Sequence, residues 1–517
     1  MKTAAMIVLA AGLAPALAQQ TNPSAPPALK ADHADGAIEV LRNGLTPQEA
    51  AKARAMIDKA VAYLRSQQHE SGGWGIREGA PVFPAITALA VNGMLLARDF
   101  DRADPAVAKG IDFILSKQQP DGGIYDAILP SYNTAISLSA LAHAPQTPKV
   151  TDAIKRAQAY LKALQWAEDA AEGGTEAASR VEKDHPFYGG VGYGNRGRPD
   201  LSNLAFAIQG LSDTGGFEGE FRERALVFIQ RCQMLETTPD GKIVNDMAYA
   251  DGSSQGGFIY ATGANKESAG KGQSFAGEIA ESLSGPAGVA ASVTLKQKGA
   301  DGKPVLLSKD ELLARVRDAV KKSSRTEDVA FGEEIMVLLG PNGDGVTANT
   351  FEVRARADSP DAFAAFLGRA LADVTDTPIT ARAVTSWRGE SRLRAYGSIT
   401  YAGFKSYAYA RLAKDDPRVT AARRWMGEHY TLDENPGMGT DGYYYYLLMF
   451  SRANDAFGEP AIPTSTGDRF WARDLVNKLA AMQNDDGSFR SIDDRWMEND
   501  PALITAYSLI ALQHAAR

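Results

Sequence analysis

Apolar and polar positions recur along this chain in two kinds of helical segment that follow one another. The first kind is amphipathic. From Pro47 to Leu64, apolar residues return at helical spacing, and Thr46 supplies an N-cap before Pro47. The second kind, first met at 84–97, is apolar on nearly every side, as expected of a helix that neighbours cover all round. We therefore predict pairs of helices, one facing solvent and one buried. Further amphipathic segments are predicted at 105–118, 148–165, 220–233, 416–425 and 470–483, and further apolar ones at 132–144, 199–213, 398–412, 443–450 and 501–512.

A short phrase joins the two helices of several pairs. A ring residue is followed five positions later by glutamine, and then come a glycine turn and an aromatic residue. The positions of this phrase that we expect to be structural are Gln68, Trp74, Gln118, Tyr125, Gln483 and Phe489. A phrase that recurs at intervals of tens of residues indicates a repeat architecture. Six helix pairs predict an all-α (α/α)6 toroid, in which the buried helices line a central cavity.

The fourth repeat is interrupted between Tyr260 and Ser398, a stretch too long for one loop of a compact domain. We predict an inserted α+β domain at 286–390, between toroid segments at 46–285 and 391–517. Its predicted strands are at 289–295, 304–307, 335–339, 350–357 and 379–387, and its predicted helices are at 310–322 and 360–374.

The N-terminus predicts export. Residues 1–18 have the pattern of a secretory signal peptide, with Lys2 before an apolar run and small residues at Ala16 and Ala18. Residues 19–45 are rich in proline and alanine and predict a flexible leader. No later apolar run is long enough to span a bilayer, so no transmembrane anchor is predicted. We expect a periplasmic or extracellular protein.

Composition narrows the function classes. The formal net charge of -8 argues against a nucleic-acid surface. The single cysteine, Cys232, excludes an internal disulfide and a cysteine-rich zinc site, and its helical surroundings favour a buried thiol. Neither a metal nor a cofactor is predicted.

The repeated phrase resembles a known superfamily. Gln68–Trp74, Gln118–Tyr125 and Gln483–Phe489 are similar to the Gln-Trp repeats of the squalene-hopene cyclase and protein prenyltransferase superfamily. The resemblance implies an α/α toroid that these residues brace, and an apolar, isoprenoid-type ligand in the ring. The catalytic strings of the superfamily are absent. The chain has no Asp-x-Asp-Asp-Thr-Ala acid motif, and Cys232 lacks accompanying zinc ligands, which argues against a zinc prenyltransferase.

Carboxylates before the last central helix are the candidates for chemistry. Asp494, Glu498 and Asp500 lie in a predicted loop, where a carboxylate beside an aromatic ring suits acid or base catalysis. A structural explanation stays open, because Asp500 before Pro501 is also a good N-cap. The candidates for lining the ligand cavity are Asp200, Asp433, Tyr401, Tyr443 and Trp496.

Three functions remain open from the sequence. The first is a cyclase-like toroid that holds an apolar ligand in its ring. The second is a secreted carbohydrate-active enzyme, because one helical toroid outline supports unrelated chemistries. The third is a non-catalytic interaction protein that binds a protein partner through the insert at 286–390.

Overall fold

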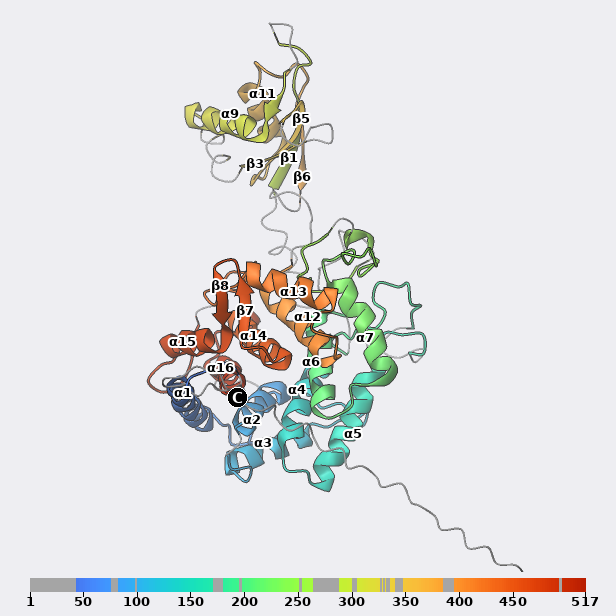
Figure 1. Cartoon of the computed structure of the whole chain (residues 1–517), viewed down its shortest axis with the longest axis vertical. Coiled ribbons are helices and arrows are strands. Elements are labelled where there is room, and N and C mark those ends of the chain that lie inside the picture. Colours follow the sequence, from blue (N-terminus) through green and yellow to red (C-terminus); the bar gives the residue numbers. More distant parts are fainter. Residues whose placement is uncertain are drawn as a thin grey trace, which may run out of the picture.

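The structure is a computed structural model that describes the chain from residue 43 onward, with interruptions (Figure 1). The described residues are 43–75, 82–97, 100–170, 180–194, 198–250, 253–263, 288–299, 305–325, 328, 331, 335–339, 347–384, 395–491 and 495–517. The predicted signal peptide and most of the predicted leader lie outside them. Within the described part of the chain, no helix is long and apolar enough to cross a membrane.

Helices of the first predicted kind carry one buried face. The predicted N-cap Thr46 is present and forms a capping box with Glu49. Side chains also cap the helices that begin at Pro105, Pro148 and Pro417. We call them the amphipathic helices: α1 (Pro47–Ser66), α3 (Pro105–Ser116), α5 (Pro148–Ala163), α7 (Gly219–Cys232), α13 (Pro417–Glu428) and α15 (Trp471–Met482).

Helices of the second kind are buried nearly all round, and every residue of the first of them is buried. We call them the central helices: α2 (Pro84–Leu95), α4 (Pro130–His143), α6 (Leu201–Asp213), α12 (Gly397–Tyr409), α14 (Tyr443–Phe457) and α16 (Pro501–Ala515). Each packs against the next in chain order, and α16 packs back against α2, so their contacts form a closed circuit (Figure 1). Each amphipathic helix contacts the central helix that precedes it in this circuit, with α1 on α16, while α7 also packs on α12 and α15 also packs on α16.

The glutamine of the repeated phrase ties each turn to the next amphipathic helix. Gln68 Nε2 donates to the carbonyl of Gly72 in its own turn at 2.7 Å and to that of Ala106 in α3 at 2.8 Å. Gln483 Nε2 donates in the same way to Met56 in α1 at 2.9 Å, which joins the last pair to the first. Equivalent bonds run from Gln118 to α5, from Gln165 to α7 and from Gln233 to α13.

The residue six positions after this glutamine is buried and anchors the central helix. The backbone N–H of Trp74 donates to the Thr87 hydroxyl of α2 at 3.0 Å, and the Trp74 indole N–H donates to a carbonyl near the end of α1 at 2.7 Å. Phe489 contacts Thr505 of α16 in the same way. In the second pair this position belongs to Ile124, whereas Tyr125 is half-buried one residue further on. Ile124 is therefore the structural counterpart of Trp74.

The fifth pair has tyrosine in place of the glutamine. The Tyr430 hydroxyl donates to the Asp474 carboxylate in the first turn of α15 at 2.8 Å. A side chain with a different hydrogen-bonding group thus makes the same connection between neighbouring amphipathic helices.

A four-stranded antiparallel sheet lies between the third and fourth central helices in the sequence, after α7 and before α12, with strand order β3-β5-β1-β6. Val289 of β1 faces Ala355 of β5 on one side and Ala383 of β6 on the other. The helices α9 (Lys309–Lys322) and α11 (Pro360–Ala370) share a hydrophobic cluster with the sheet, separate from that of the central helices. The strands are β1 (Gly288–Thr294), β2 (Leu307–Ser308), β3 (Ile335–Leu339), β4 (Thr347–Ala348), β5 (Thr350–Ala355) and β6 (Thr380–Val384).

One β-hairpin was not predicted from the sequence. Strands β7 (Ala461–Thr464) and β8 (Gly467–Phe470) pair after α14, and β7 packs on α13. The strands are only four residues long, and Pro463 interrupts the apolar alternation that would mark a strand. The periodic signal is therefore too short to distinguish the hairpin from a loop.

Candidate functional site

The predicted catalytic carboxylates Glu498 and Asp500 cap two central helices. Both carboxylate oxygens of Glu498 accept backbone N–H groups at the start of α14, from Tyr444 at 3.0 Å and from Tyr445 at 2.8 Å. The N-cap residue of α14 is a glycine without a side chain to do this. Asp500 Oδ1 accepts the Leu503 N–H of α16 at 2.8 Å. A helix N-terminus favours the charged form of a carboxylate, so both groups have a structural role at these positions.

The remaining candidates of this region are dispersed. Asp494 lies outside the described residues. Trp496 is partly exposed, has a left-handed backbone with φ 52°, and covers Gly442 at the start of α14. Asp433 is exposed and forms an ion pair with Lys478 at 2.7 Å. Of the described candidates, Trp496 and Glu498 thus both contact the start of α14, whereas Asp433 is an exposed surface charge.

The predicted tyrosines lie between helices. The Tyr401 ring packs against Tyr446 and Phe450 of α14, with centroid distances of 5.7 and 5.0 Å. The Tyr443 hydroxyl bonds the Leu432 carbonyl. Both side chains thus stabilise packing around α14.

Asp200 is the predicted candidate whose environment is most unusual. It is 2% exposed and caps α6, accepting hydrogen bonds from the backbone and side-chain nitrogens of Asn203, both at 2.8 Å. Burial raises the pKa of the Asp200 carboxyl to about 6, although these bonds and one from the Tyr260 hydroxyl favour its charged form. Burial thus outweighs the hydrogen bonds in its effect on the pKa of Asp200.

Four central helices contribute rings that meet in the middle of the circuit. We call Tyr132, Phe206, Tyr445 and Tyr507 the aromatic quartet. Its ring centroids are 4.8 Å apart from Tyr132 to Phe206, 6.0 Å from Phe206 to Tyr445 and 6.5 Å from Tyr445 to Tyr507. The hydroxyls of Tyr132 and Tyr507 lie 3.2 Å apart, which closes the set. The rings pack edge to face or tilted against one another, and the electron-rich face of such a ring favours contact with apolar or cationic groups.

Two buried cations lie next to the aromatic quartet. Lys405 of α12 is fully buried, with Nζ 5.6 Å from the centroid of the Phe206 ring. Arg452 of α14 is 3% exposed. Burial, together with the charge of Arg452, holds the pKa of the Lys405 amine well below its usual value, and Asp213 opposes this shift.

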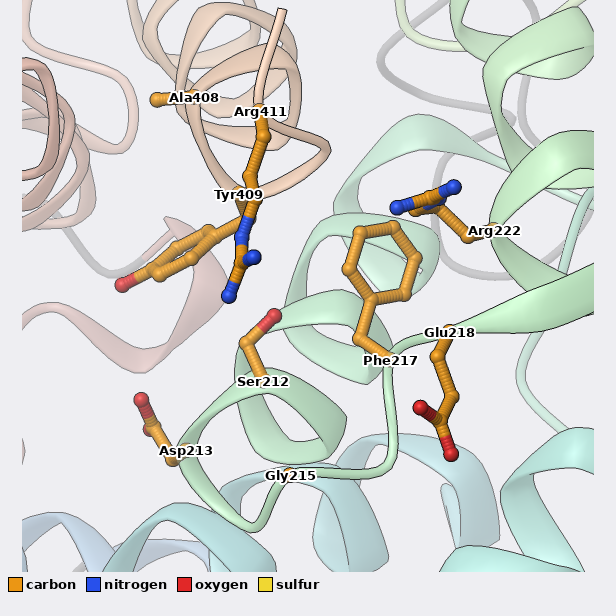
Figure 2. A pocket seen from close by; sticks show the side chains of 9 residues that line it. All are labelled: Ser212, Asp213, Gly215, Phe217, Glu218, Arg222, Ala408, Tyr409 and Arg411. Atoms are coloured by element: carbon orange, nitrogen blue, oxygen red, sulfur yellow. The ribbon is translucent and has the colours of Figure 1, made fainter. Parts of the chain in front are cut away.

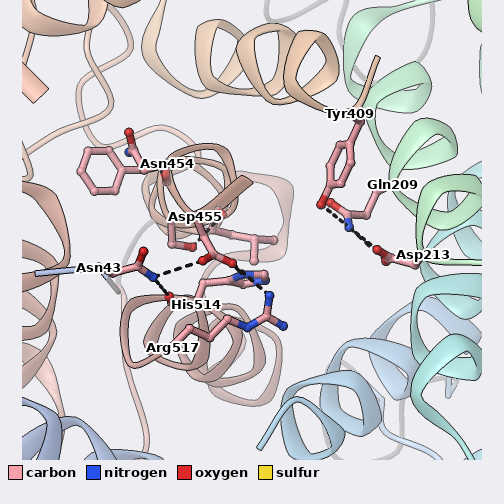
Figure 3. Close-up of polar contacts among 11 residues, drawn as sticks. Asn43, Gln209, Asp213, Tyr409, Asn454, Asp455, His514 and Arg517 are labelled. Atoms are coloured by element: carbon pink, nitrogen blue, oxygen red, sulfur yellow. Dashed lines mark hydrogen bonds and ion pairs between the residues drawn. The ribbon is translucent and has the colours of Figure 1, made fainter. Parts of the chain in front are cut away.

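A pocket of about 410 Å³ opens at the C-terminal ends of α6 and α12 (Figure 2). Asp213 and Tyr409 lie at its edge, and Arg222 and Arg411 also line it. Gln209 connects the first two, because its Nε2 donates to Asp213 at 2.8 Å and to the Tyr409 hydroxyl at 2.7 Å (Figure 3).

A second polar cluster links the two ends of the described chain (Figure 3). Asp455 of α14 accepts from Asn43 at 3.1 Å, contacts the His514 ring at 2.7 Å and pairs with Arg517 at 2.9 Å. Burial lowers the pKa of His514 to about 4, so this ring is neutral near pH 7. Through Asp455 and His514, the cluster fastens α16 to α14.

Sequence reasoning missed Arg452 and the aromatic quartet. One signal was available: an arginine or lysine inside a helix that is otherwise apolar on all sides must be buried, and Lys405 and Arg452 are such residues. Among the described residues, no group of three or more histidine, cysteine, aspartate or glutamate side chains is placed to hold a metal ion.

Comparison with known proteins gives a limited likeness. No family model matches the chain. Over 112 residues it is 36% identical to drimenyl diphosphate synthase from Streptomyces showdoensis, a match that covers 19% of this chain and 20% of that enzyme. The chain thus matches about a fifth of the length of this curated relative.

Solved structures of a type II terpene cyclase from Scytonema align with 91% of this chain and 99% of their own. Sequence identity is 13% for the complex with merosterolic acid A and 12% for the complex with geranylgeranyl dihydroxybenzoate, and the TM-score is 0.26 for both. The resemblance to the terpenoid cyclase-like superfamily predicted from the glutamine phrase is confirmed.

Proposed function

We propose that this chain is an exported α/α toroid of six helix-pair repeats, interrupted at 286–390 by an α+β domain, and that its ring interior binds an apolar, isoprenoid-type ligand. The closed circuit of contacts among the central helices supports the ring. The separate hydrophobic clusters of helices and sheet support the division into two units. The apolar runs at residues 4–13 and the small residues that follow support export.

The aromatic quartet is the observation that carries the ligand proposal. Four rings from four helices that are distant in sequence converge on one interior surface. Such a surface offers dispersion contacts to a hydrocarbon chain and electron-rich faces to a developing cation. The similarity of a fifth of the chain to drimenyl diphosphate synthase agrees with an isoprenoid-type ligand.

If the bound ligand is turned over, Asp200 is the first acid to test. Its carboxyl is buried and its pKa is raised to about 6 by that burial, as a proton donor in a dry site requires. Glu498 and Asp500 remain candidates, but their capping bonds already explain their positions. An Asp200→Asn variant that binds ligand without converting it would assign the acid.

The binding proposal is tested by calorimetric titration of the full chain with geranylgeraniol, alongside native mass spectrometry of protein purified from its own cells. We expect saturable binding in the titration and a co-purifying apolar mass in the spectrum. Phe206→Ala should weaken the binding, because it removes one ring of the quartet, whereas Phe363→Ala, in the cluster of the sheet, should not. Absence of both the heat signal and the adduct would contradict the proposal.

The two other functions have less support from the described residues. A carbohydrate-active enzyme needs two free carboxylates flanking one bond, and Glu498 and Asp500 are both engaged at helix ends. A scaffold that binds a protein partner through 286–390 would keep its role when the aromatic quartet is mutated and lose it when that segment is removed. Mutation of the quartet and removal of 286–390 therefore distinguish ligand binding in the ring from partner binding through the insert.

A further inference from the structure

Two cations in the middle of the central helices have polar atoms without a counterpart. Lys405 Nζ has no hydrogen-bond partner among the described residues, and neither has Arg452 Nε. Their side chains are 0% and 3% exposed, so both groups lie in the interior. Burial of a polar group without a hydrogen-bond partner opposes folding, which makes these two side chains candidates for binding a ligand.

The charges around Lys405 and Arg452 do not balance. Asp213 is the carboxylate that acts on both of them. The other buried carboxylate nearby, Asp455, is already shared by His514 and Arg517. Burial favours the neutral form of Lys405 when no ligand is bound. When Lys405 is protonated, two positive groups face one negative group, and one positive charge has no counter-ion within the described part of the ring.

The two cations lie between the pocket and the aromatic quartet. Tyr409, at the pocket, follows Lys405 by four residues of α12, so Lys405 lies about one helical turn deeper. On the other side, Lys405 Nζ lies over the Phe206 ring of the quartet. On a path from the pocket into the interior, the two cations therefore come first and the aromatic quartet follows.

We propose that Lys405 and Arg452 bind the anionic head group of an amphiphilic ligand, a carboxylate, whose apolar chain lies along the aromatic quartet. This inference rests on the proposed function, because it assigns the head group of the same ligand. One uncompensated positive charge matches a monoanion, whereas a diphosphate would need further cations. The order of the interior places the head group near the pocket and the apolar chain beyond it.

The test compares three ligands of the same chain length on the full-length protein. Geranylgeranoic acid, geranylgeraniol and geranylgeranyl diphosphate are titrated into the wild type and into Lys405→Met, an unbranched apolar replacement of similar length. We expect the wild type to bind the acid roughly tenfold to a hundredfold more tightly than the alcohol, the usual effect of a charged hydrogen bond. Lys405→Met should bind the acid as weakly as the alcohol and leave the alcohol unaffected.

A matched control and a second variant complete the experiment. Lys242→Met changes an exposed lysine and should leave all three affinities unchanged. Without ligand, Lys405→Met should melt at a higher temperature than the wild type, because it removes a buried amine without a hydrogen-bond partner. Should Lys405→Met fail to fold, Arg452→Met, which removes the other cation, provides the same comparison.

The outcomes separate this inference from the proposed function. Equal affinity of the wild type for the acid and the alcohol would overturn the head-group site and leave apolar binding standing. Absence of binding by all three ligands would overturn both. Tighter binding of the diphosphate than of the acid would overturn the assignment of a carboxylate.

Discussion

At the scale of single residues, burial decides which acidic side chains have unusual chemistry. Asp433 is exposed, and its ion pair with Lys478 lowers its pKa. Asp200 has an equally simple local role as an N-cap but is enclosed on all sides, and its pKa is raised to about 6. The same residue type thus serves as a solvated surface charge at one position and as a buried carboxyl with a raised pKa at another.

This difference predicts how Asp200→Asn changes stability with pH. The folded-state pKa of Asp200 is above its usual value of 3.8, so the charged carboxylate costs stability, and that cost appears as pH rises from about 4 through about 6. Asparagine keeps an oxygen for the Asn203 N–H and carries no charge. Its NH₂ group would face the Asn203 side-chain nitrogen, which removes one hydrogen bond at every pH. In urea unfolding, the stability of the variant relative to the wild type should therefore increase by up to about 3 kcal/mol between pH 4 and pH 8.

The control for this measurement is Asp433→Asn. Its ion pair is exposed, so the substitution should cost less than about 1 kcal/mol and show the opposite sign. A stability difference for Asp200→Asn that is the same at pH 4 and pH 8 would show that the carboxyl titrates normally.

At the scale of elements, contacts between neighbouring repeats fix the turns. Gly72 has φ +89°, and a Cβ atom built there would lie 2.7 Å from the Lys109 carbonyl oxygen of α3. Glycine is therefore required at this position for two reasons. The backbone has a left-handed conformation, and the next helix lies too close for a Cβ atom. Gly241 has a similar φ of +84° but nothing within 4 Å.

The two glycines provide a matched pair of substitutions. Gly72→Ala and Gly241→Ala both force alanine into a left-handed conformation, which costs about 1–2 kcal/mol. Gly72→Ala should cost more than this because α3 must also move away, whereas Gly241→Ala should show only the backbone cost. Chemical denaturation of both variants measures the difference. Equal losses would mean that the helix contact at Gly72 is not tight.

Because Glu498 caps α14, its substitution should change the stability of the protein. Its two carboxylate oxygens accept two backbone N–H groups, and glutamine would turn an NH₂ group toward one of them. Glu498→Gln should therefore lower the free energy of unfolding by about 1–3 kcal/mol, whether or not the protein is an enzyme. Glu434→Gln, in an exposed part of the preceding loop, is the control and should be neutral. An unchanged stability in Glu498→Gln would restore Glu498 as a functional carboxylate.

The starts of helices and the positions of turns were the features that could best be predicted from the sequence. Helix starts such as Thr46-Pro47 and the glycine turns depend on neighbours within a few residues, and they are visible in the chain. The cap of α14 comes from Glu498, more than fifty residues away, and no local pattern marks it. The role of Ile124 was also missed, because its equivalence to Trp74 becomes visible only when the hydrogen bonds of the two turns are compared. Asp200 could be identified as a cap, but its raised pKa depends on surroundings that only the packing provides.

At the scale of the whole molecule, the circuit joins segments from both ends of the chain. In repeat proteins each repeat is stabilised by contacts with its nearest neighbours, so the end repeats of an open array, which have one neighbour, are less stable. Here α16 packs on α2 and α1, and Asn43 donates to the carbonyl of His514 at 2.7 Å.

If the circuit of helices is closed, a hydrogen bond between the last and first helix pairs should stabilise the fold as much as one between two consecutive pairs. Gln483→Ala removes the bond from the last turn to Met56 in α1, and Gln118→Ala removes the equivalent bond from the second turn to Ala153 in α5. Each leaves a helix carbonyl without its side-chain donor, so we expect both to lower the free energy of unfolding by about 1–2 kcal/mol. Guanidinium denaturation followed by far-ultraviolet circular dichroism should show the same shift of midpoint with an unchanged slope. A loss in Gln118→Ala with none in Gln483→Ala would mean that the first and last pairs separate in solution, and the aromatic quartet, which needs α16 beside α4, would then not persist.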